Sequence, residues 1–163
     1  MELKRRFNFR RVVSIIYALL FAIYIAVGLQ PADAVQYEIS GELKIPAINL
    51  VSDVTTLKLE DHKLNTPDTI VGSYIRTPSK IFLIGHSSTV FKNLNQIKIN
   101  DEIEYNNKFY EVVNTEIFKK DDIDMTEVLA STKRNTLIIM TCAGIPMGGH
   151  DATHRLIVTA LEK

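Results

Sequence analysis

This sequence of 163 residues has almost no cysteine, no tryptophan and no excess of either charge. Tryptophan is absent and Cys142 is the single cysteine, so an internal disulfide is excluded and a zinc site built from several thiolates is not expected. Lysine and arginine number 19, as do aspartate and glutamate, so the whole chain has no net charge that would attract nucleic acid. A lone thiol is either a small buried apolar side chain or a nucleophile, and its surroundings must decide.

A long uncharged run lies near the N-terminus. Residues 12–29 carry no charge, and at about 1.5 Å per residue they make a helix of roughly 27 Å, close to the roughly 30 Å hydrocarbon core. Five basic residues precede this run, whereas Asp33 and Glu38 follow it, which places the N-terminus in the cytoplasm and the rest outside. We therefore predict a basic cytoplasmic tail at 1–11, a transmembrane signal-anchor at 12–29 and a linker at 30–41.

A cleaved secretory signal peptide is the alternative interpretation of this segment. Ala32-Asp33-Ala34 resembles a small-x-small cleavage site, and the basic start of the chain suits either interpretation. The apolar run is longer than the usual core of about 7–15 residues in a signal peptide, which favours an uncleaved anchor. Under both interpretations the remaining domain is exported, and we predict a single-pass membrane protein whose folded domain lies outside the cytoplasm.

Residues 42–163 have the pattern of many short strands separated by turn residues. Two continuous apolar runs, 81–84 and 136–140, predict strands that are buried on both faces. Residues 156–161 predict a last strand. Because strands outnumber helices, we predict an all-β domain, either a small closed barrel or a sandwich.

Turns and short helices complete the predicted domain. The pair Asn106-Asn107 suits a two-residue hairpin turn, because asparagine tolerates positive φ. A short helix is expected within residues 56–65, before Thr66-Pro67-Asp68 ends it. Residues 121–132 are expected to form a polar loop with about one helical turn. With the strands, these segments make one domain of ordinary size.

Three chemically useful side chains lie at the ends of predicted strands. His86 comes two residues after 81–84, and Cys142 comes two residues after 136–140. If these strands are parallel neighbours, their C-terminal ends share one rim of the sheet. Arg155 opens the last strand, and an antiparallel return beside the strand of Cys142 brings it opposite the thiol. We therefore predict that sulfur, imidazole and guanidinium share one pocket.

This set of side chains suits acyl transfer through a thioester. A thiol near pKa 8.5 is mostly protonated at neutral pH, and a neighbouring cation favours the nucleophilic thiolate. The imidazole of His86 can give a proton to a departing amine and remove one from an incoming amine. The guanidinium of Arg155 offers fixed donors to a carbonyl oxygen as it becomes an oxyanion. No acidic side chain is required, so these two residues and Cys142 suffice.

Around these three residues the sequence resembles the sortases, a family of cysteine transpeptidases. The matching stretches are IFLIGHSS around His86, LIIMTCAG around Cys142 and HRLIVTAL around Arg155. Sortases carry a histidine in a Gly-His context, a cysteine that ends a Thr-Leu-x-Thr-Cys strand, and an arginine on the next strand. All three features occur here in the same order.

The resemblance extends over roughly Leu43 to Leu161. Phe91–Leu94 is similar to the family's Phe-x-x-Leu segment, and Asn100–Ile103 is similar to its Gly-Asp-x-Ile/Val turn, with asparagine in place of glycine. Ile138 and Ile139 stand where the family usually has Thr-Leu. None of these departures touches a catalytic position. The short chain without terminal extensions favours an A-, D- or E-like class.

The resemblance implies a fold, a reaction and partners. Sortases form an eight-stranded barrel tethered by one N-terminal transmembrane helix, and they cleave a sorting signal such as Leu-Pro-x-Thr-Gly near the end of a secreted protein. The cysteine holds the protein as a thioester, which an amine of a peptidoglycan precursor or of a pilin lysine then attacks. Cys142, His86 and Arg155 would be catalytic, and Thr141 would support the oxyanion through its backbone or hydroxyl. We therefore expect a sortase catalytic domain at 42–163.

No metal or cofactor is expected from the sequence. Some sortases bind calcium through carboxylates in the loop before the histidine strand, but residues 72–80 contain no carboxylate. His150, Asp151 and His154 have the composition of a metal site, and their spacing fits one face of a helix. The glycines at 148–149 favour instead a flexible loop that borders the substrate groove.

Other kinds of protein fit the pattern less well. Papain-like amidases place the cysteine before the histidine, whereas here His86 precedes Cys142. L,D-transpeptidases have an arginine two residues after the cysteine, and here Arg155 lies much further along. The remaining alternative is a non-catalytic, membrane-anchored barrel that serves as a binding or scaffold module, and thiol-blocking reagents would distinguish it from an enzyme.

Overall fold

A computed structural model of the chain describes residues 37–61 and 63–163. The predicted cytoplasmic tail at 1–11, the predicted transmembrane segment at 12–29 and the first part of the predicted linker lie outside the described residues. Among the residues that are described, no helix has the length and apolar character needed to cross a bilayer.

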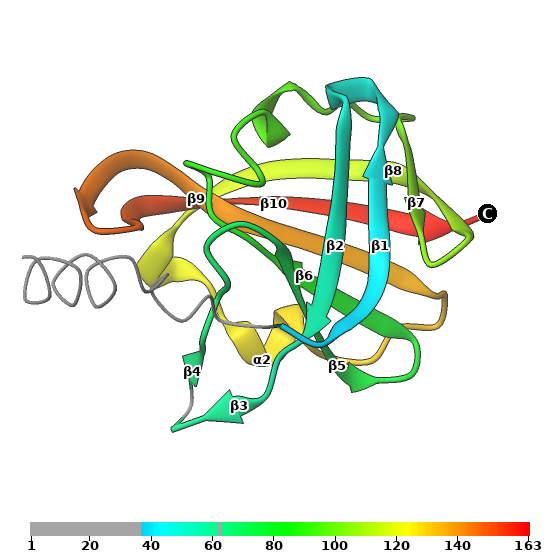
Figure 1. The fold of residues 1–163 in the computed structure, drawn as a ribbon, viewed down its shortest axis with the longest axis horizontal. Coiled ribbons are helices and arrows are strands. Elements are labelled where there is room, and N and C mark those ends of the chain that lie inside the picture. Colours follow the sequence, from blue (N-terminus) through cyan, green and yellow to red (C-terminus); the bar gives the residue numbers. More distant parts are fainter. Residues whose placement is uncertain (1–36, 62) are drawn as a thin grey trace, which may run out of the picture. The chain divides into compact units, whose positions relative to one another are not determined.

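Strands dominate the described chain, as the sequence pattern predicted. They lie at Ile39–Ile45 (β1), Leu50–Thr56 (β2), Leu59–Glu60 (β3), Lys63–Leu64 (β4), Val71–Thr77 (β5), Lys80–Ile84 (β6), Glu102–Tyr105 (β7), Lys108–Lys119 (β8), Thr136–Gly148 (β9) and Asp151–Glu162 (β10). All but β3 and β4 form a closed barrel in the order β1-β2-β5-β6-β9-β10-β8-β7 (Figure 1). The predicted eight-stranded barrel is therefore confirmed, and its first strand begins within the range predicted as linker.

Short elements connect the strands. They are the 3-10 turns η1 (Pro46–Ile48), η2 (Leu94–Gln96) and η3 (Lys120–Asp122) and the helix α2 (Met125–Val128). The one helical turn predicted within 121–132 is present. The helix predicted within 56–65 is wrong, because an antiparallel hairpin of β3 and β4 occupies this range. Asp61 there has a φ of 47°, and a left-handed residue cannot continue a right-handed helix.

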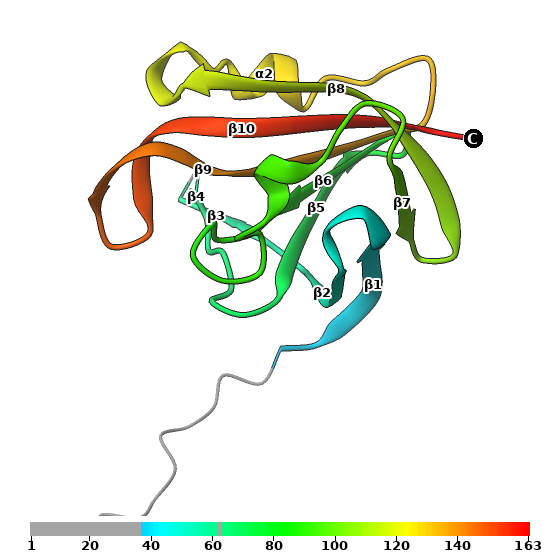
Figure 2. The ribbon, with the colours of Figure 1, turned by 90° about the horizontal axis from the view of Figure 1, so that it is seen from above.

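Strands β6 and β9 are buried on both faces, which explains their uninterrupted apolar sequences. They run parallel, with Leu83 opposite Ile139, and both of these side chains fill the barrel interior. Phe82 and Ile138 point the other way, into a second cluster against which Met125 and Val128 of α2 pack. The helix α2 lies outside the barrel (Figure 2). The parallel pairing is as the sequence predicted, but it brings the C-terminal end of β6 beside the middle of β9 and not beside its end, because β9 continues to Gly148.

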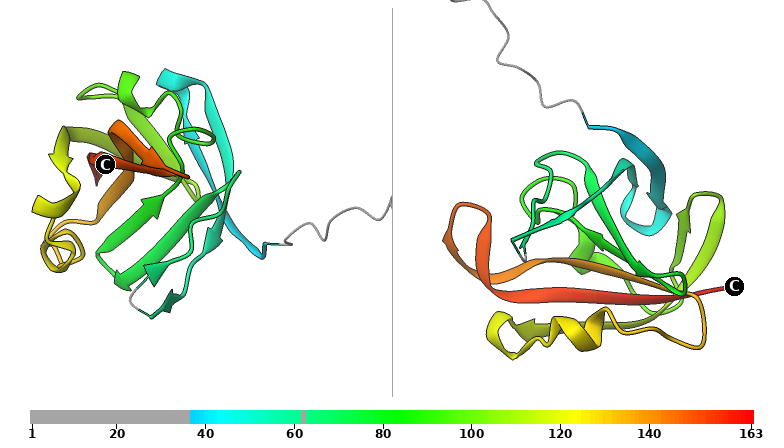
Figure 3. Two further views of the ribbon diagram at one scale, coloured as in Figure 1. Left: turned by 90° about the vertical axis from the view of Figure 1, so that its left-hand side faces the viewer. Right: turned by 90° about the horizontal axis from the view of Figure 1, so that it is seen from below.

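Strands β9 and β10 form an antiparallel hairpin that projects from one end of the barrel (Figures 1 and 3). β9 continues well past Cys142, and β10 begins at Asp151, before the strand predicted at 156–161. Gly148 and Gly149 turn the chain with φ values of 104° and 56°. The predicted flexible loop is therefore mostly strand. Residues 144–150 are exposed, so backbone pairing forms this part of the hairpin without an apolar face that the sequence could mark.

The predicted turn at Asn106-Asn107 is confirmed between β7 and β8. The two residues have φ values of 50° and 61°, and Tyr105 pairs with Lys108 across the turn. The side chain of Asn106 also accepts a hydrogen bond of 3.0 Å from the backbone N–H of Glu42. Because β7 pairs with β1 at this point, the contact supports closure of the barrel.

Candidate active site

Cys142, His86 and Arg155 lie together at one end of the barrel. Cys142 on β9 is the direct partner of Arg155 on β10 in the antiparallel ladder. His86 follows the end of β6, and all three residues line one pocket of about 180 Å³. The structure thus brings the three predicted residues together as expected from the sequence. It differs in one detail, since Arg155 lies inside β10 and not at its start.

Thr141 holds the end of β6 against β9. Its hydroxyl is buried and donates a hydrogen bond of 2.8 Å to the carbonyl of Gly85. Gly85 has no room for a side chain, because a Cβ there would lie 2.5 Å from Val90 and 2.8 Å from Phe91. The single hydroxyl proton of Thr141 is thus already engaged in positioning the strand end that carries His86. Of the two oxyanion roles predicted for Thr141, this contact leaves only the backbone.

A buried segment anchors the loop that follows His86. The backbone N–H of Phe91 donates to the carbonyl of His86 at 3.0 Å, and Phe91 is 1% exposed. Leu94 is fully buried in the same core. These two residues are the apolar ends of the Phe-x-x-Leu segment in the sequence. Their burial fixes the backbone on the C-terminal side of His86, as Thr141 fixes it on the N-terminal side.

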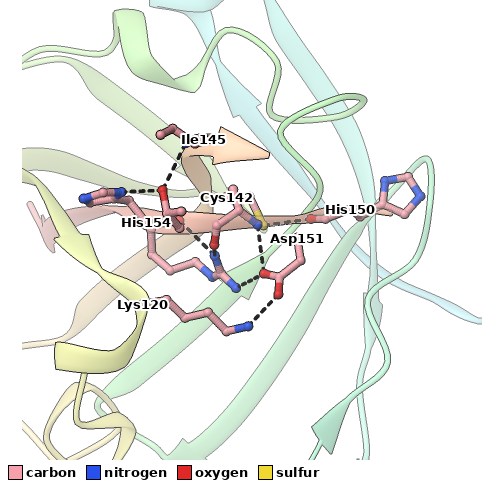
Figure 4. Close-up of polar contacts among 9 residues, drawn as sticks. Lys120, Cys142, Ile145, His150, Asp151 and His154 are labelled. Atoms are coloured by element: carbon pink, nitrogen blue, oxygen red, sulfur yellow. Dashed lines mark hydrogen bonds and ion pairs between the residues drawn. The ribbon is translucent and has the colours of Figure 1, made fainter. Parts of the chain in front are cut away.

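The turn between β9 and β10 closes over the sulfur (Figure 4). The thiol of Cys142 donates a hydrogen bond of 3.0 Å to the backbone carbonyl of His150. The imidazole of His150 stacks on that of His86, with ring centroids 4.1 Å apart and an angle of 27° between the planes. A peptide that reaches the sulfur from the side of His150 must therefore displace this turn.

Arg155 is held by groups of its own hairpin (Figure 4). Nη1 donates to the carbonyls of Ala152 and His154, both at 2.8 Å, and Nη2 donates to Oδ1 of Asp151 at 2.6 Å. Asp151 also accepts a hydrogen bond from Lys120, and Lys120 and Arg155 together hold the pKa of this carboxyl far below its usual range. The guanidinium is 14% exposed and stays beside the strand of Cys142.

His86 is surrounded by groups that favour its neutral form. Burial lowers its pKa most, and the neighbouring His150 lowers it further. A backbone hydrogen bond with Thr66 and the carboxylate of Asp68 raise the pKa, but they do not compensate. Oδ1 of Asp68 lies 3.7 Å from Nε2 of His86 and 3.7 Å from Nε2 of His150. The imidazole of His86 is therefore poised to accept a proton.

Replacing His150 by glutamine should raise the pKa of His86. The change removes a group whose positive charge disfavours the imidazolium of His86. Asp68→Asn should lower the same pKa, because the carboxylate favours the imidazolium. The ring protons of His86, followed by NMR as the pH is varied, measure both shifts, and the corresponding limb of the pH–rate profile should move with them. Shifts of the same sign in the two variants would contradict this account of the site.

The structure separates His150, Asp151 and His154, which the sequence placed near one another. His150 faces His86, and Asp151 faces Arg155. Nδ1 of His154 instead contacts the hydroxyl of Thr153 at 2.7 Å. The i,i+4 spacing has no helical meaning here, because the three residues lie in a turn and a strand.

Asp68 and Thr66 are residues of the site that the sequence did not identify. Thr66-Pro67-Asp68 has only the composition of a chain break, and nothing in the surrounding residues relates it to a histidine. The fold brings this loop between β4 and β5 next to the loop after β6, where the hydroxyl of Thr89 donates to the carbonyl of Asp68. Only the tertiary structure reveals this neighbour.

A second pocket opens on another side of Cys142. It has a volume of about 290 Å³, and Ser87, Lys92 and Asn95 contribute polar groups to its wall. Thr141 and Cys142 line both pockets. Cys142 therefore borders two pockets, an arrangement that suits an acyl-transfer enzyme with a donor and an acceptor.

Known proteins were compared with the chain at the level of sequence and of fold. The family model of the sortase domain matches residues 43–163, whereas no curated protein matches the sequence. Similar solved structures include a sortase A lid mutant from Corynebacterium diphtheriae, at 23% identity and a TM-score of 0.60, covering 83% of this chain and 75% of that one. Sortase A from Listeria monocytogenes has 16% identity and a TM-score of 0.60, with coverages of 77% and 87%.

Sortase C-1 from Actinomyces oris is similar too, at 25% identity and a TM-score of 0.57, covering 82% of each chain. These structures share the barrel fold with the present chain. The family model covers well over half of the sequence and includes Cys142, His86 and Arg155. The chain therefore belongs to the sortase family, whose members are cysteine transpeptidases.

Proposed function

We propose that this sortase is an exported, membrane-anchored enzyme that cleaves a sorting signal of the Leu-Pro-x-Thr-Gly kind and joins the cleaved protein to an amine. The grouping of Cys142, His86 and Arg155 around one pocket is the observation that supports this most. The acyl donors would be secreted proteins that carry the signal near their C-terminus. The acceptor would be a peptidoglycan precursor or a pilin lysine.

In the first step, neutral His86 takes the proton of the Cys142 thiol, and the resulting thiolate adds to the threonine carbonyl carbon of the sorting signal. The C–N bond to the following glycine then breaks, and His86 in its protonated form gives its proton to the departing amine. The products are a thioester on Cys142 and a free C-terminal peptide. This assignment needs the sulfur and the imidazole in one pocket, as they are here.

In the second step, a primary amine attacks the thioester carbon. Neutral His86 removes a proton from the amine, the C–S bond breaks, and Cys142 returns to its thiolate form. The lowered pKa of His86 favours the neutral base that this step requires. The second pocket beside Cys142 offers the amine a path that the first peptide does not fill.

Arg155 would stabilise the oxyanion or hold the bound peptide once its donors are released. At present Asp151 and two carbonyls of the hairpin occupy these donors. The same turn supplies the His150 carbonyl that contacts the sulfur. Outward movement of this turn would therefore uncover Cys142 and release Nη2 of Arg155 from Asp151, while Nη1 stays bonded to the carbonyls of Ala152 and His154 in β10.

The uncharged run at 12–29 and the basic residues before it support a single-pass anchor with the catalytic domain outside the cytoplasm. In this arrangement the lipid bilayer is a partner of the N-terminal helix. The domain beyond the linker would meet its donor and acceptor substrates as they emerge at the outer surface of the membrane.

A peptide library tests this function directly. The full-length protein, purified in a mild detergent, is incubated with peptides that vary around Leu-Pro-x-Thr-Gly and with an oligoglycine or lysine amine. We expect mass spectrometry to show cleavage after threonine and a new amide between threonine and the added amine. If no peptide is cleaved or transferred while the folded protein still reacts with a thiol-alkylating reagent, the non-catalytic scaffold becomes the better interpretation.

A further inference from the structure

We propose that Asp68, His86 and His150 form a binding site for Zn²⁺, and that zinc bound there blocks the transfer reaction. The three residues come from the loop before β5, the loop after β6 and the turn between β9 and β10. One ligand atom from each lies within 4.8 Å of the other two. The inhibitory consequence rests on the proposed function of His86, whereas the binding itself does not.

The chemistry of the three groups selects the ion. Two imidazoles and one carboxylate form a ligand set that zinc accepts, and a three-ligand zinc site leaves its fourth position for water. Calcium and magnesium prefer oxygen ligands and coordinate imidazole poorly. The neutral imidazole is the form that binds a metal.

Two of the three distances between ligand atoms are close to those of a bound ion, and the third, between the two imidazoles, is at most 4.8 Å. Zinc bonds of about 2.0–2.1 Å in a tetrahedron place ligand atoms about 3.4 Å apart. The carboxylate oxygen of Asp68 lies 3.7 Å from Nε2 of each imidazole, so these two edges need to shorten by only a few tenths of an ångström. His86 is 15% exposed and fixed, whereas Asp68 and His150 are 76% and 49% exposed and can turn toward it.

Neighbouring hydroxyls orient the two mobile ligands. The hydroxyl of Ser88 lies 3.3 Å from Nδ1 of His150, which leaves Nε2 of that ring free to face the carboxylate. The hydroxyl of Thr89 donates to the backbone carbonyl of Asp68 and ties its loop to the segment after His86. Such outer contacts fix the orientation of metal ligands in established sites.

Zinc at this position would stop the reaction in two ways. It would occupy the lone pair of His86 and so remove the proton acceptor of the transfer step. It would also link His150 to the barrel, and the backbone carbonyl of His150 contacts the sulfur of Cys142. The turn would then stay closed over the thiol and over Arg155. Cys142 is not one of the three grouped ligands, so zinc would act without binding the nucleophile.

Cobalt titration of the full-length protein in mild detergent tests the site without any substrate. We expect one Co²⁺ to bind with visible d–d absorption, to be displaced by Zn²⁺, and to lack the intense thiolate-to-metal band. Cys142→Ala should retain this binding. Asp68→Asn and His150→Gln should each weaken cobalt binding about 100-fold or more, because losing a ligand weakens metal binding at least as much as losing one of its outer contacts. His154→Gln, a histidine change in the same hairpin, should bind as the unchanged protein does.

Zinc should also inhibit peptide transfer by the unchanged protein, with recovery on addition of a chelator. Inhibition of His150→Gln, measured relative to the zinc-free rate of the same variant, should require a much higher zinc concentration. The proposal is overturned if Asp68→Asn and His150→Gln bind cobalt normally, or if Cys142→Ala abolishes the spectrum and so identifies the thiol as the ligand. Absence of peptide transfer in all samples would instead refute the proposed function, and the cobalt spectra would still decide the metal site.

Discussion

Replacing Cys142 by alanine is expected to abolish both cleavage and transfer, with a loss of roughly 10⁴-fold or more in kcat/KM. Cys142 is the only thiol of the chain, so no second sulfur can replace it. Among the nearby hydroxyls, that of Ser88 contacts His150 and that of Thr141 donates to Gly85, so neither is paired with His86 as a nucleophile would be. The thioester cannot form, and every later step depends on it.

The measurement is the initial rate of peptide cleavage and of amide formation by the unchanged protein and by Cys142→Ala. Thermal unfolding followed by circular dichroism should show nearly equal stability, because the thiol is only partly buried and loses a single hydrogen bond to His150. Stepwise alkylation of the unchanged protein should reduce activity in proportion to the modified thiol. Transfer that persists in Cys142→Ala would show that another group is the nucleophile.

Replacing His86 by alanine should reduce kcat/KM by roughly 10²–10⁴-fold, the range typical for loss of a general acid–base group. His86 lies in the same pocket as Cys142, and its imidazole is the one that the structure keeps neutral beside the sulfur. Without it, the departing amine must leave unprotonated and the incoming amine must attack with its proton retained. Both steps of the transfer should therefore slow down.

Two comparisons distinguish a chemical role of His86 from a structural one. Added imidazole should restore part of the activity of His86→Ala, because the vacated space lies beside an exposed turn. The thioester intermediate should accumulate differently in single-turnover experiments with strong and weak leaving groups. His154→Gln serves as the matched control, since His154 contacts Thr153 in the same hairpin and should change the rate little. A loss of less than tenfold in His86→Ala would remove His86 from the proposed mechanism.

The turn between β9 and β10 covers the site in this structure. His150 and Asp151 lie next to each other in the chain, and they contact Cys142 and Arg155 respectively. A single short segment therefore covers the nucleophile and binds one end of the guanidinium. Substrate binding that opens this segment would prepare both groups at once, whereas a metal that holds His150 would keep both restrained.

The sequence predicted an all-β domain and the three residues of the proposed reaction, and its resemblance to sortases selected the barrel over a sandwich. The runs at 81–84 and 136–140 are apolar at every position because each strand has a cluster on both faces. Parallel pairing of such strands brings their C-terminal ends together, which is why the positions of His86 and Cys142 could be related before the structure was seen. Arg155 followed from the antiparallel ladder, in which the register determines the partner.

Only the tertiary structure decided what surrounds these residues. The sequence predicted a helix within 56–65 and a flexible loop from Gly148 onward. Both segments instead form hairpins through backbone hydrogen bonds, which leave no apolar pattern in the sequence. It gave no sign that Asp68 lies beside His86, or that Asp151 binds Arg155. Apolar patterns report which faces are buried, whereas contacts between polar groups of distant loops depend on the path of each loop in the folded chain.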